Sequence, residues 1–147
     1  QPSIGHIDVK GSIASLIDIS LGMDMEATGY ENIRMRAVMM GMKLKQIKII
    51  EEEIADFTEL GKFLELPVRT YSTGMHMRLG FAVSTTVPAD IILMDEWLSV
   101  GDGDFLIKAE KRLYDYIQKS SILVIASHSE DLISKLTNQT LRLEHQA

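Results

Sequence analysis

The stretch IILMDE, residues 91–96, indicates the fold class of this chain. Its four apolar residues without alternation are typical of a parallel strand that is buried on both faces. The run SILVIA, residues 121–126, has the same character, and a helix is expected between the two strands over residues 104–119. A further helix is expected from Ser129, its N-cap, to about residue 136, followed by a last strand over residues 140–143. This β-α-β-α-β order predicts an open parallel sheet with crossover helices.

The middle of the chain, residues 24–88, is expected to be helical. Thr28 and Glu31 fit a capping box, in which each side chain bonds the other residue's backbone N–H, and they predict a helix from about Gly29 to Met40. Further helices are expected over residues 44–57, 60–66 and 72–87, the last two ending at prolines 67 and 88. Before this region, short strands are expected over residues 4–9 and 12–17.

The composition limits the class of protein. The 147 residues suffice for one domain with a hydrophobic core, and 46% hydrophobic with 24% charged residues is ordinary for a soluble globular chain. The net charge of −6 argues against a nucleic-acid partner, which needs a basic surface. The absence of cysteine excludes disulfide and thiol chemistry. No apolar run approaches the roughly 20 residues that span a bilayer.

Three polar side chains follow the two predicted core strands. Ligands of open α/β sheets bind beyond the carboxyl ends of the strands. There, Asp95 is a candidate ligand of Mg²⁺, and Glu96 is a candidate for orienting or deprotonating a water that attacks phosphate. His128 follows the next strand and is a candidate to contact phosphate or that water. Because one crossover unit separates them, we expect these residues to be neighbours. The structural alternative is a strand that ends in a solvated acidic turn, with His128 in a purely structural role.

The stretch YSTGMHMRLGFAV, residues 71–83, begins a helix in an unusual way. A hydroxyl and a glycine stand where the cap and first turn are expected, and they leave backbone N–H groups free to point outward. Such a helix start favours an anion, because the free donors and the positive end of the helix dipole act together. Taken alone, the same stretch is also typical of a capped helix with a methionine-rich apolar face.

Together these elements resemble the nucleotide-binding subunit of ABC transporters over essentially the whole chain. YSTGM, residues 71–75, stands where that family has its signature, and Ser72 precedes Asp95 by the family's spacing. DEWLSVGD resembles the end of Walker B and the D-loop, with Ser99 and Asp102 at the matching places, and His128 matches the switch histidine. The stretches ATGYENI and VGDGDF resemble the branch that exports polysaccharides such as O-antigen and teichoic acid.

The resemblance implies a P-loop NTPase-type, RecA-like parallel sheet with a helical subdomain. Residues 24–88 are expected to form that subdomain, and residues 1–23 and 89–147 the α/β core. The implied activity is ATP hydrolysis, with ATP and Mg²⁺ as cofactors, driving export of O-antigen or teichoic acid. The implied roles are Mg²⁺ ligation by Asp95, base catalysis by Glu96 and a switch function for His128.

The resemblance also implies partners. Ser72, Thr73 and Gly74 are expected to contact ATP on the other subunit of a homodimer of nucleotide-binding subunits. A membrane-spanning permease is the second expected partner, docked by the helical middle. The expected location is cytoplasmic, peripheral on the inner face of the cytoplasmic membrane.

Two departures from the family pattern qualify this interpretation. The Q-loop glutamine has no counterpart, and Asp18 is the nearest polar candidate at that position. No Gly-x-x-x-x-Gly-Lys-Ser/Thr loop, which cradles the β- and γ-phosphates, occurs in the sequence. We therefore interpret the chain as a partial ABC ATPase domain, incomplete at its N-terminus and inactive alone. The alternatives are a non-catalytic interaction module and an ABC-class ATPase unrelated to transport.

Overall fold

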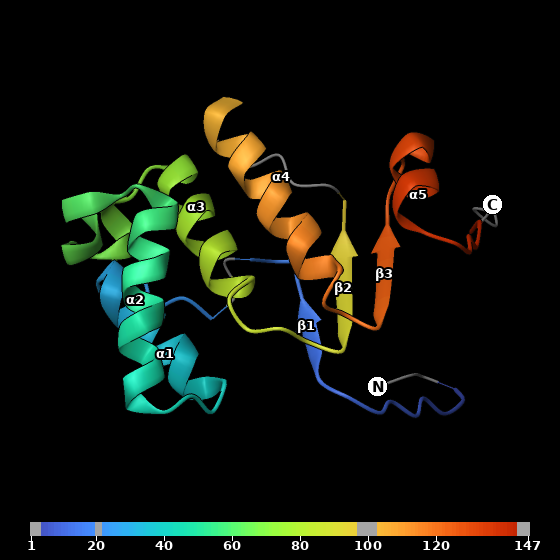
Figure 1. Cartoon of the computed structure of the whole chain (residues 1–147), viewed down its shortest axis with the longest axis horizontal. Helices are drawn as coiled ribbons and strands as arrows, with labels where there is room; N and C mark the ends of the chain where they lie inside the picture. Colours follow the sequence, from blue (N-terminus) through green and yellow to red (C-terminus); the bar gives the residue numbers. More distant parts are fainter. Residues whose placement is uncertain (1–3, 20–21, 97–102, 144–147) are drawn as a thin grey trace.

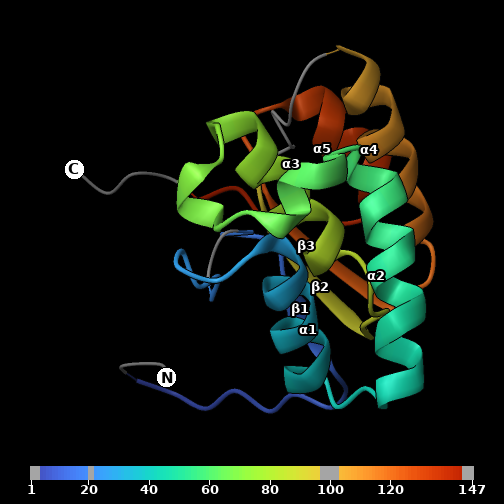
Figure 2. The same ribbon diagram turned by 90° about the vertical axis from the view of Figure 1, so that its left-hand side faces the viewer.

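The computed structural model describes residues 4–19, 22–96 and 103–143 (Figure 1). Its helices and strands, in chain order, are β1 (Ile13–Ser15), α1 (Gly29–Met39), α2 (Leu44–Thr58), two 3₁₀ helices (Gly61–Glu65 and Val68–Thr70), α3 (Thr73–Ser84), β2 (Ile91–Asp95), α4 (Gly103–Ile117), β3 (Ile122–Ala126) and α5 (Glu130–Leu136). The helices α2, α3 and α4 lie on one side of the sheet (Figures 1 and 2).

The sheet has three parallel strands in the order β1-β2-β3, as the prediction of an open parallel sheet requires. In its register, Ile92 of β2 lies between Ala14 of β1 and Leu123 of β3. These three residues face the helices, and Ile92 is completely buried. The register places Ile13 and Ile122 on the opposite face, where each is more than half exposed. One face of the sheet is therefore packed and the other is open.

Three expectations about the strands are wrong. The core strands are not buried on both faces, because no described element covers the second face, where Val124 is 53% exposed. Residues 4–9 and 140–143 form no strand, since a strand needs a hydrogen-bonding neighbour and neither segment pairs with another. The strand expected over residues 12–17 is limited to β1 for the same reason.

The helices follow the sequence signals closely. The capping box of Thr28 and Glu31 is present: the Glu31 N–H donates to the Thr28 hydroxyl at 3.2 Å, and the Thr28 N–H donates to the Glu31 carboxylate at 2.7 Å. The expected helix over residues 60–66 is a 3₁₀ helix. Helix α3 ends at Ser84, earlier than predicted, where the hydroxyls of Thr85 and Thr86 bond carbonyls of its last turn. None of the helices in the described ranges is long and apolar enough to cross a bilayer.

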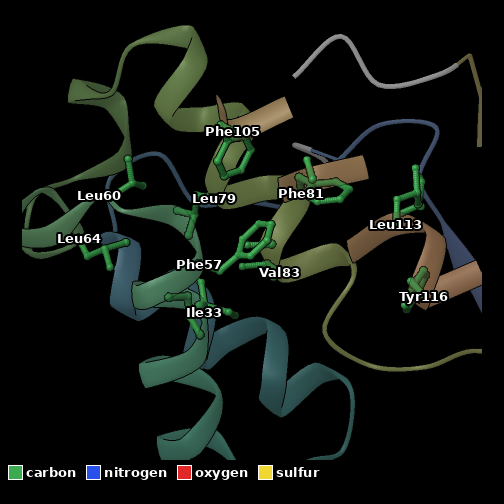
Figure 3. Packing of buried hydrophobic residues seen from close by; sticks show 14 of the residues in the cluster. Ile33, Phe57, Leu60, Leu64, Leu79, Phe81, Val83, Phe105, Leu113 and Tyr116 are labelled. Carbon is green, nitrogen blue, oxygen red and sulfur yellow. The ribbon is translucent and has the colours of Figure 1, made fainter. Parts of the chain in front are cut away.

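One hydrophobic core joins the helical middle to the sheet (Figure 3). At its centre the Phe57 ring lies 6.1 Å from that of Phe81 and meets the Phe105 ring edge-on at 5.4 Å. Because these rings come from α2, α3 and α4, burial of the same apolar surface fixes all three helices together. The Tyr116 hydroxyl of α4 donates to the Val87 carbonyl at 2.9 Å, close to the start of β2.

A polar contact aligns β1 with β2 at the amino ends of the strands. The Asp90 carboxylate accepts hydrogen bonds from the backbone N–H and the hydroxyl of Ser12, both at 2.8 Å. These bonds, the backbone bond first, hold the pKa of Asp90 below its ordinary value. Gly11 precedes them at φ +119°, where a Cβ atom would lie 2.9 Å from the Asp90 Cβ, so only glycine fits. The contact sets the register that places the strand ends at the opposite edge.

Candidate functional site

The candidate site begins where β2 ends. Asp95 is the last residue of the strand, and Glu96 follows in the left-handed region at φ 62°, which is uncommon for a residue other than glycine. The Glu96 N–H still continues the sheet by donating to the Ala126 carbonyl at 2.8 Å. The chain therefore turns sharply at Glu96 while its backbone remains bonded to β3, and such strained residues cluster at functional sites.

The Glu96 carboxylate is held by the turn that follows β3. One oxygen accepts the backbone N–H of His128 at 3.2 Å, and the other accepts the Ser127 hydroxyl at 3.3 Å. The Ser127 oxygen in turn accepts the Ser129 N–H at 3.1 Å, so its own proton is available for Glu96. The expectation that Glu96 and His128 are neighbours at one sheet edge is confirmed. We call this arrangement, Glu96 with Ser127 and His128, the carboxylate clamp.

Sequence reasoning missed Ser127. The available signal was a hydroxyl residue directly before His128, at the end of a strand parallel to the one that ends in Asp95 and Glu96. The His128 side chain is exposed, and its imidazole bonds no other described residue. It is therefore free to contact a ligand.

The Asp95 carboxylate is exposed at the same edge and bonds no described side chain. No group of three or more acidic or histidine side chains able to hold a metal is found in the described ranges. Mg²⁺ at nucleotide sites usually keeps several waters and binds one or two carboxylates together with phosphate oxygens. A single open aspartate therefore fits Mg²⁺ held jointly with a nucleotide.

The start of α3 presents hydrogen-bond donors, whereas the sheet edge presents acidic side chains. Ser72 is the N-cap, and its hydroxyl accepts the Met75 N–H at 3.3 Å. The N–H groups of Thr73 and Gly74 meet no acceptor among the described residues. A Cβ atom on Gly74 would meet only the Ser72 hydroxyl, at 4.0 Å, so the space in front of this helix start is open. Free N–H groups at the positive end of a helix fit a phosphate.

The structure does not join the α3 start to the carboxylate clamp. No hydrogen bond or ion pair links Ser72, Thr73 or Gly74 to Asp95, Glu96 or His128, all of which are described. Both places nevertheless lie toward the same end of the molecule, at the top of Figure 1. Asp18 is exposed three residues beyond β1, at the same edge of the sheet as Asp95. Ser99 and Asp102 lie outside the described residues, so the D-loop stays a prediction.

Arg78 fixes α3 in place. Its guanidinium stacks over the Phe105 ring at 4.5 Å and donates to the Thr58 carbonyl at 3.4 Å. Arg78 therefore ties α3 to α2 and α4 in this structure.

Comparison with known proteins yields relatives over nearly the whole chain. The chain is 49% identical over 143 residues, 97% of its length, to the O-antigen export system ATP-binding protein RfbE of Yersinia enterocolitica. It is 39% and 41% identical to the teichoic acids export ATP-binding protein TagH of Bacillus cereus and Bacillus anthracis, over 97% and 99% of its length. It spans 60% of RfbE and 26% of each TagH. No protein-family model matches the chain.

The fold also has a solved counterpart. A dimeric structure of the ATP-binding cassette MJ0796, in a post-hydrolysis state bound to ADP and Pi, superposes with a TM-score of 0.62 at 17% identity. The match covers 82% of this chain and 54% of that one. The predicted P-loop NTPase-type fold and the resemblance to ATP-binding proteins of O-antigen and teichoic acid export are thus confirmed. The division into subdomains and the roles of the site residues stay predictions.

Proposed function

We propose that the chain is part of the ATP-binding subunit of an ABC transporter, which hydrolyses ATP to drive export of a polysaccharide of the O-antigen or teichoic acid class. The carboxylate clamp carries this proposal: a glutamate oriented at a sheet edge, in a chain 49% identical to an O-antigen export ATP-binding protein. A carboxylate placed beyond a parallel strand is suited to act on a water that attacks a phosphate.

The residues at this edge of the sheet have different proposed roles. Glu96 accepts the proton of the attacking water, a role typically worth about 10²–10⁴-fold in rate, and the clamp holds its carboxylate in one orientation. Asp95 holds Mg²⁺, which neutralises charge on phosphate oxygens when it is bound. The exposed His128 imidazole contacts the terminal phosphate. The positions of Asp18, Ser99 and Asp102 in the family pattern give them supporting roles at the same nucleotide.

The start of α3 serves the second subunit of a homodimer. Ser72, Thr73 and Gly74 have open space before them and no bond to the described acids of their own chain. We therefore assign them to the γ-phosphate of ATP bound by the partner. The dimeric ATP-binding cassette that shares this fold supports the assignment.

No described element covers the open face of the sheet. Ile13, Ile122 and Val124 expose an apolar surface there, and the chain spans only 60% of RfbE. We propose that the remaining part of the ATP-binding domain covers this face and supplies the phosphate-binding loop. A protein that contains this chain and that loop is called the extended protein below. It sits peripherally on the inner face of the cytoplasmic membrane, bound to a membrane-spanning permease through residues 24–88.

Two measurements test the proposed function. The extended protein should release phosphate from ATP in the presence of Mg²⁺, whereas the 147-residue chain should not, because it lacks the loop that cradles the β- and γ-phosphates. With its permease, the extended protein should restore surface polysaccharide in cells whose export ATP-binding protein has been deleted. Phosphate release without restored export would reject the transport role and leave the ATPase. No phosphate release by the folded extended protein would favour a non-catalytic interaction module.

A further inference from the structure

The segment from Arg34 to Lys48 carries positive charge that has no role in the proposed ATPase chemistry. It holds five of the chain's 15 lysines and arginines and none of its 21 acids, in a chain of net charge −6. Arg34 is paired with Glu51 of α2. Lys43, Lys45 and Lys48 are exposed and form no ion pair with any described residue. This basic stretch is concentrated where α1 turns into α2.

Helix stability does not explain these lysines. They stand before and within the first turns of α2, at the positive end of its dipole, whereas Glu51, Glu52 and Glu53 follow further along the helix. A helix is stabilised by the reverse arrangement, with acids near its start and cations near its end. The lysines are therefore placed against the preference of their own helix, which points to something outside the chain.

Apolar side chains protrude beside the lysines. Val38 and Met39 at the end of α1 are 59% and 77% exposed, and Leu44 at the start of α2 is 84% exposed. The inward side of the same hairpin is fully packed, with Ala37 and Ile47 buried. This turn lies at an extremity of the molecule, away from the carboxyl ends of β2 and β3 (Figures 1 and 2). We call Val38, Met39, Lys43, Leu44, Lys45 and Lys48 the basic corner.

We propose that the basic corner rests on the anionic headgroups of a lipid bilayer, with Met39 and Leu44 entering the interface and the three lysines binding headgroup phosphates. Apolar side chains ringed by lysines are the pattern of surfaces that lie in the membrane interface. Each lysine near an anionic membrane surface contributes favourably to binding. A protein interface is the less suitable partner, because the cores of such interfaces are depleted in lysine.

This contact goes beyond the proposed function, since it requires neither ATP nor the permease. The test uses the 147-residue chain and protein-free vesicles of phosphatidylcholine, with and without phosphatidylglycerol, in a co-sedimentation assay. The chain should bind only vesicles that contain phosphatidylglycerol, and binding should weaken as salt is raised. The triple variant Lys43→Gln, Lys45→Gln, Lys48→Gln should bind about 100-fold more weakly, at about 1 kcal/mol per lysine.

A matched control variant removes the same number of positive charges at positions outside the basic corner. The variant Lys62→Gln, Lys111→Gln, Lys119→Gln alters three exposed lysines outside the corner and should bind nearly as the parent chain does. The single variant Leu44→Gln should bind severalfold more weakly with no change in charge. Equal losses in the two triple variants would overturn the proposal, because binding would then follow net charge alone. Binding that ignores phosphatidylglycerol, as expected from the open sheet face, or no binding at all, as expected of a corner that docks only the permease, would overturn it too.

Discussion

The backbone N–H of His128 lies 3.2 Å from a carboxylate oxygen of Glu96 and donates a hydrogen bond to it. The bond joins the turn after β2 to the turn after β3, two places 32 residues apart in sequence. It orients the carboxylate before any nucleotide arrives, so the orientation is a property of the fold. Pre-set geometry of this kind lowers the cost of bringing a base to the reacting water.

Ser127 should act on catalysis through Glu96. In the extended protein, Ser127→Ala should lower kcat for ATP hydrolysis about tenfold and leave KM unchanged, because one donor to the carboxylate is lost while the nucleotide contacts remain. Ser127→Thr keeps the hydroxyl and should restore most of the rate. Steady-state phosphate release measures both constants. A rise in KM with kcat intact, or a threonine variant as slow as alanine, would show that Ser127 is not a positioning residue.

Arg112 should be a main tie between the helical middle and α4. Its guanidinium stacks on Phe57 at 4.6 Å and donates to the Thr85 hydroxyl and the Glu53 carboxylate, both at 2.8 Å. Arg112→Met should reduce the free energy of unfolding by about 1–3 kcal/mol, since it removes these bonds and the stacking together. Lys111→Met, at the exposed neighbouring position, should change it by less than about 0.5 kcal/mol. Urea denaturation compares the two, and equal losses would contradict the assignment.

Asp90 should make the fold sensitive to acid. Its pKa is lowered in the folded chain, so ionised Asp90 stabilises the fold at pH values above its ordinary pKa of 3.8. That contribution is lost as the pH falls through the lowered folded value. Between about pH 5 and pH 3, the parent chain should therefore lose more of its urea stability than Asp90→Asn does.

Ser12→Ala provides the second arm of this test. It removes the Ser12 hydroxyl, one of the two donors that lower the pKa of Asp90, and keeps the backbone N–H. The variant should therefore be less sensitive to acid than the parent chain, by a smaller amount than Asp90→Asn. Identical acid profiles for the parent chain and Asp90→Asn would show that the contact with Ser12 does not favour the ionised form.

Gly74 should act on the partner subunit. Gly74→Asp places a carboxylate in the open space before α3, where a phosphate of the partner's ATP is proposed to lie. ATP-driven dimerisation of the extended protein should fail, because two negative charges would meet, while nucleotide affinity of the monomer stays nearly normal. Gly74→Ala adds only a methyl group and should retain part of the dimerisation. A dimer that forms equally with Gly74→Asp would remove α3 from the partner's site.

Local signals predicted most of the helices, and long-range contacts explain what they missed. The pair Thr28 and Glu31 lies within one turn, so their capping box could be recognised directly. The early end of α3 depends on the rotamers of Thr85 and Thr86, which sequence does not specify. Residues 4–9 have strand composition but no strand to pair with, and pairing is a property of the whole sheet.

Part of the candidate site could likewise be predicted from local signals in the sequence, and part depends on long-range contacts. Asp95, Glu96 and His128 could be placed at one edge because parallel strands end together. The place of Ser127 beside His128 could be read from the sequence, but its bond to Glu96 could not. That bond depends on the left-handed turn at Glu96, which the residue types do not indicate.

The central claim is that Glu96 is the base of an ATPase. The most direct measurement is phosphate release by the extended protein carrying Glu96→Gln, compared with size-exclusion chromatography of the same protein in ATP and Mg²⁺. Glutamine keeps the shape but cannot take a proton, so hydrolysis should fall by about 10²–10⁴-fold while ATP still binds and holds a stable dimer. Hydrolysis at the parent rate, or loss of ATP binding together with hydrolysis, would contradict the account.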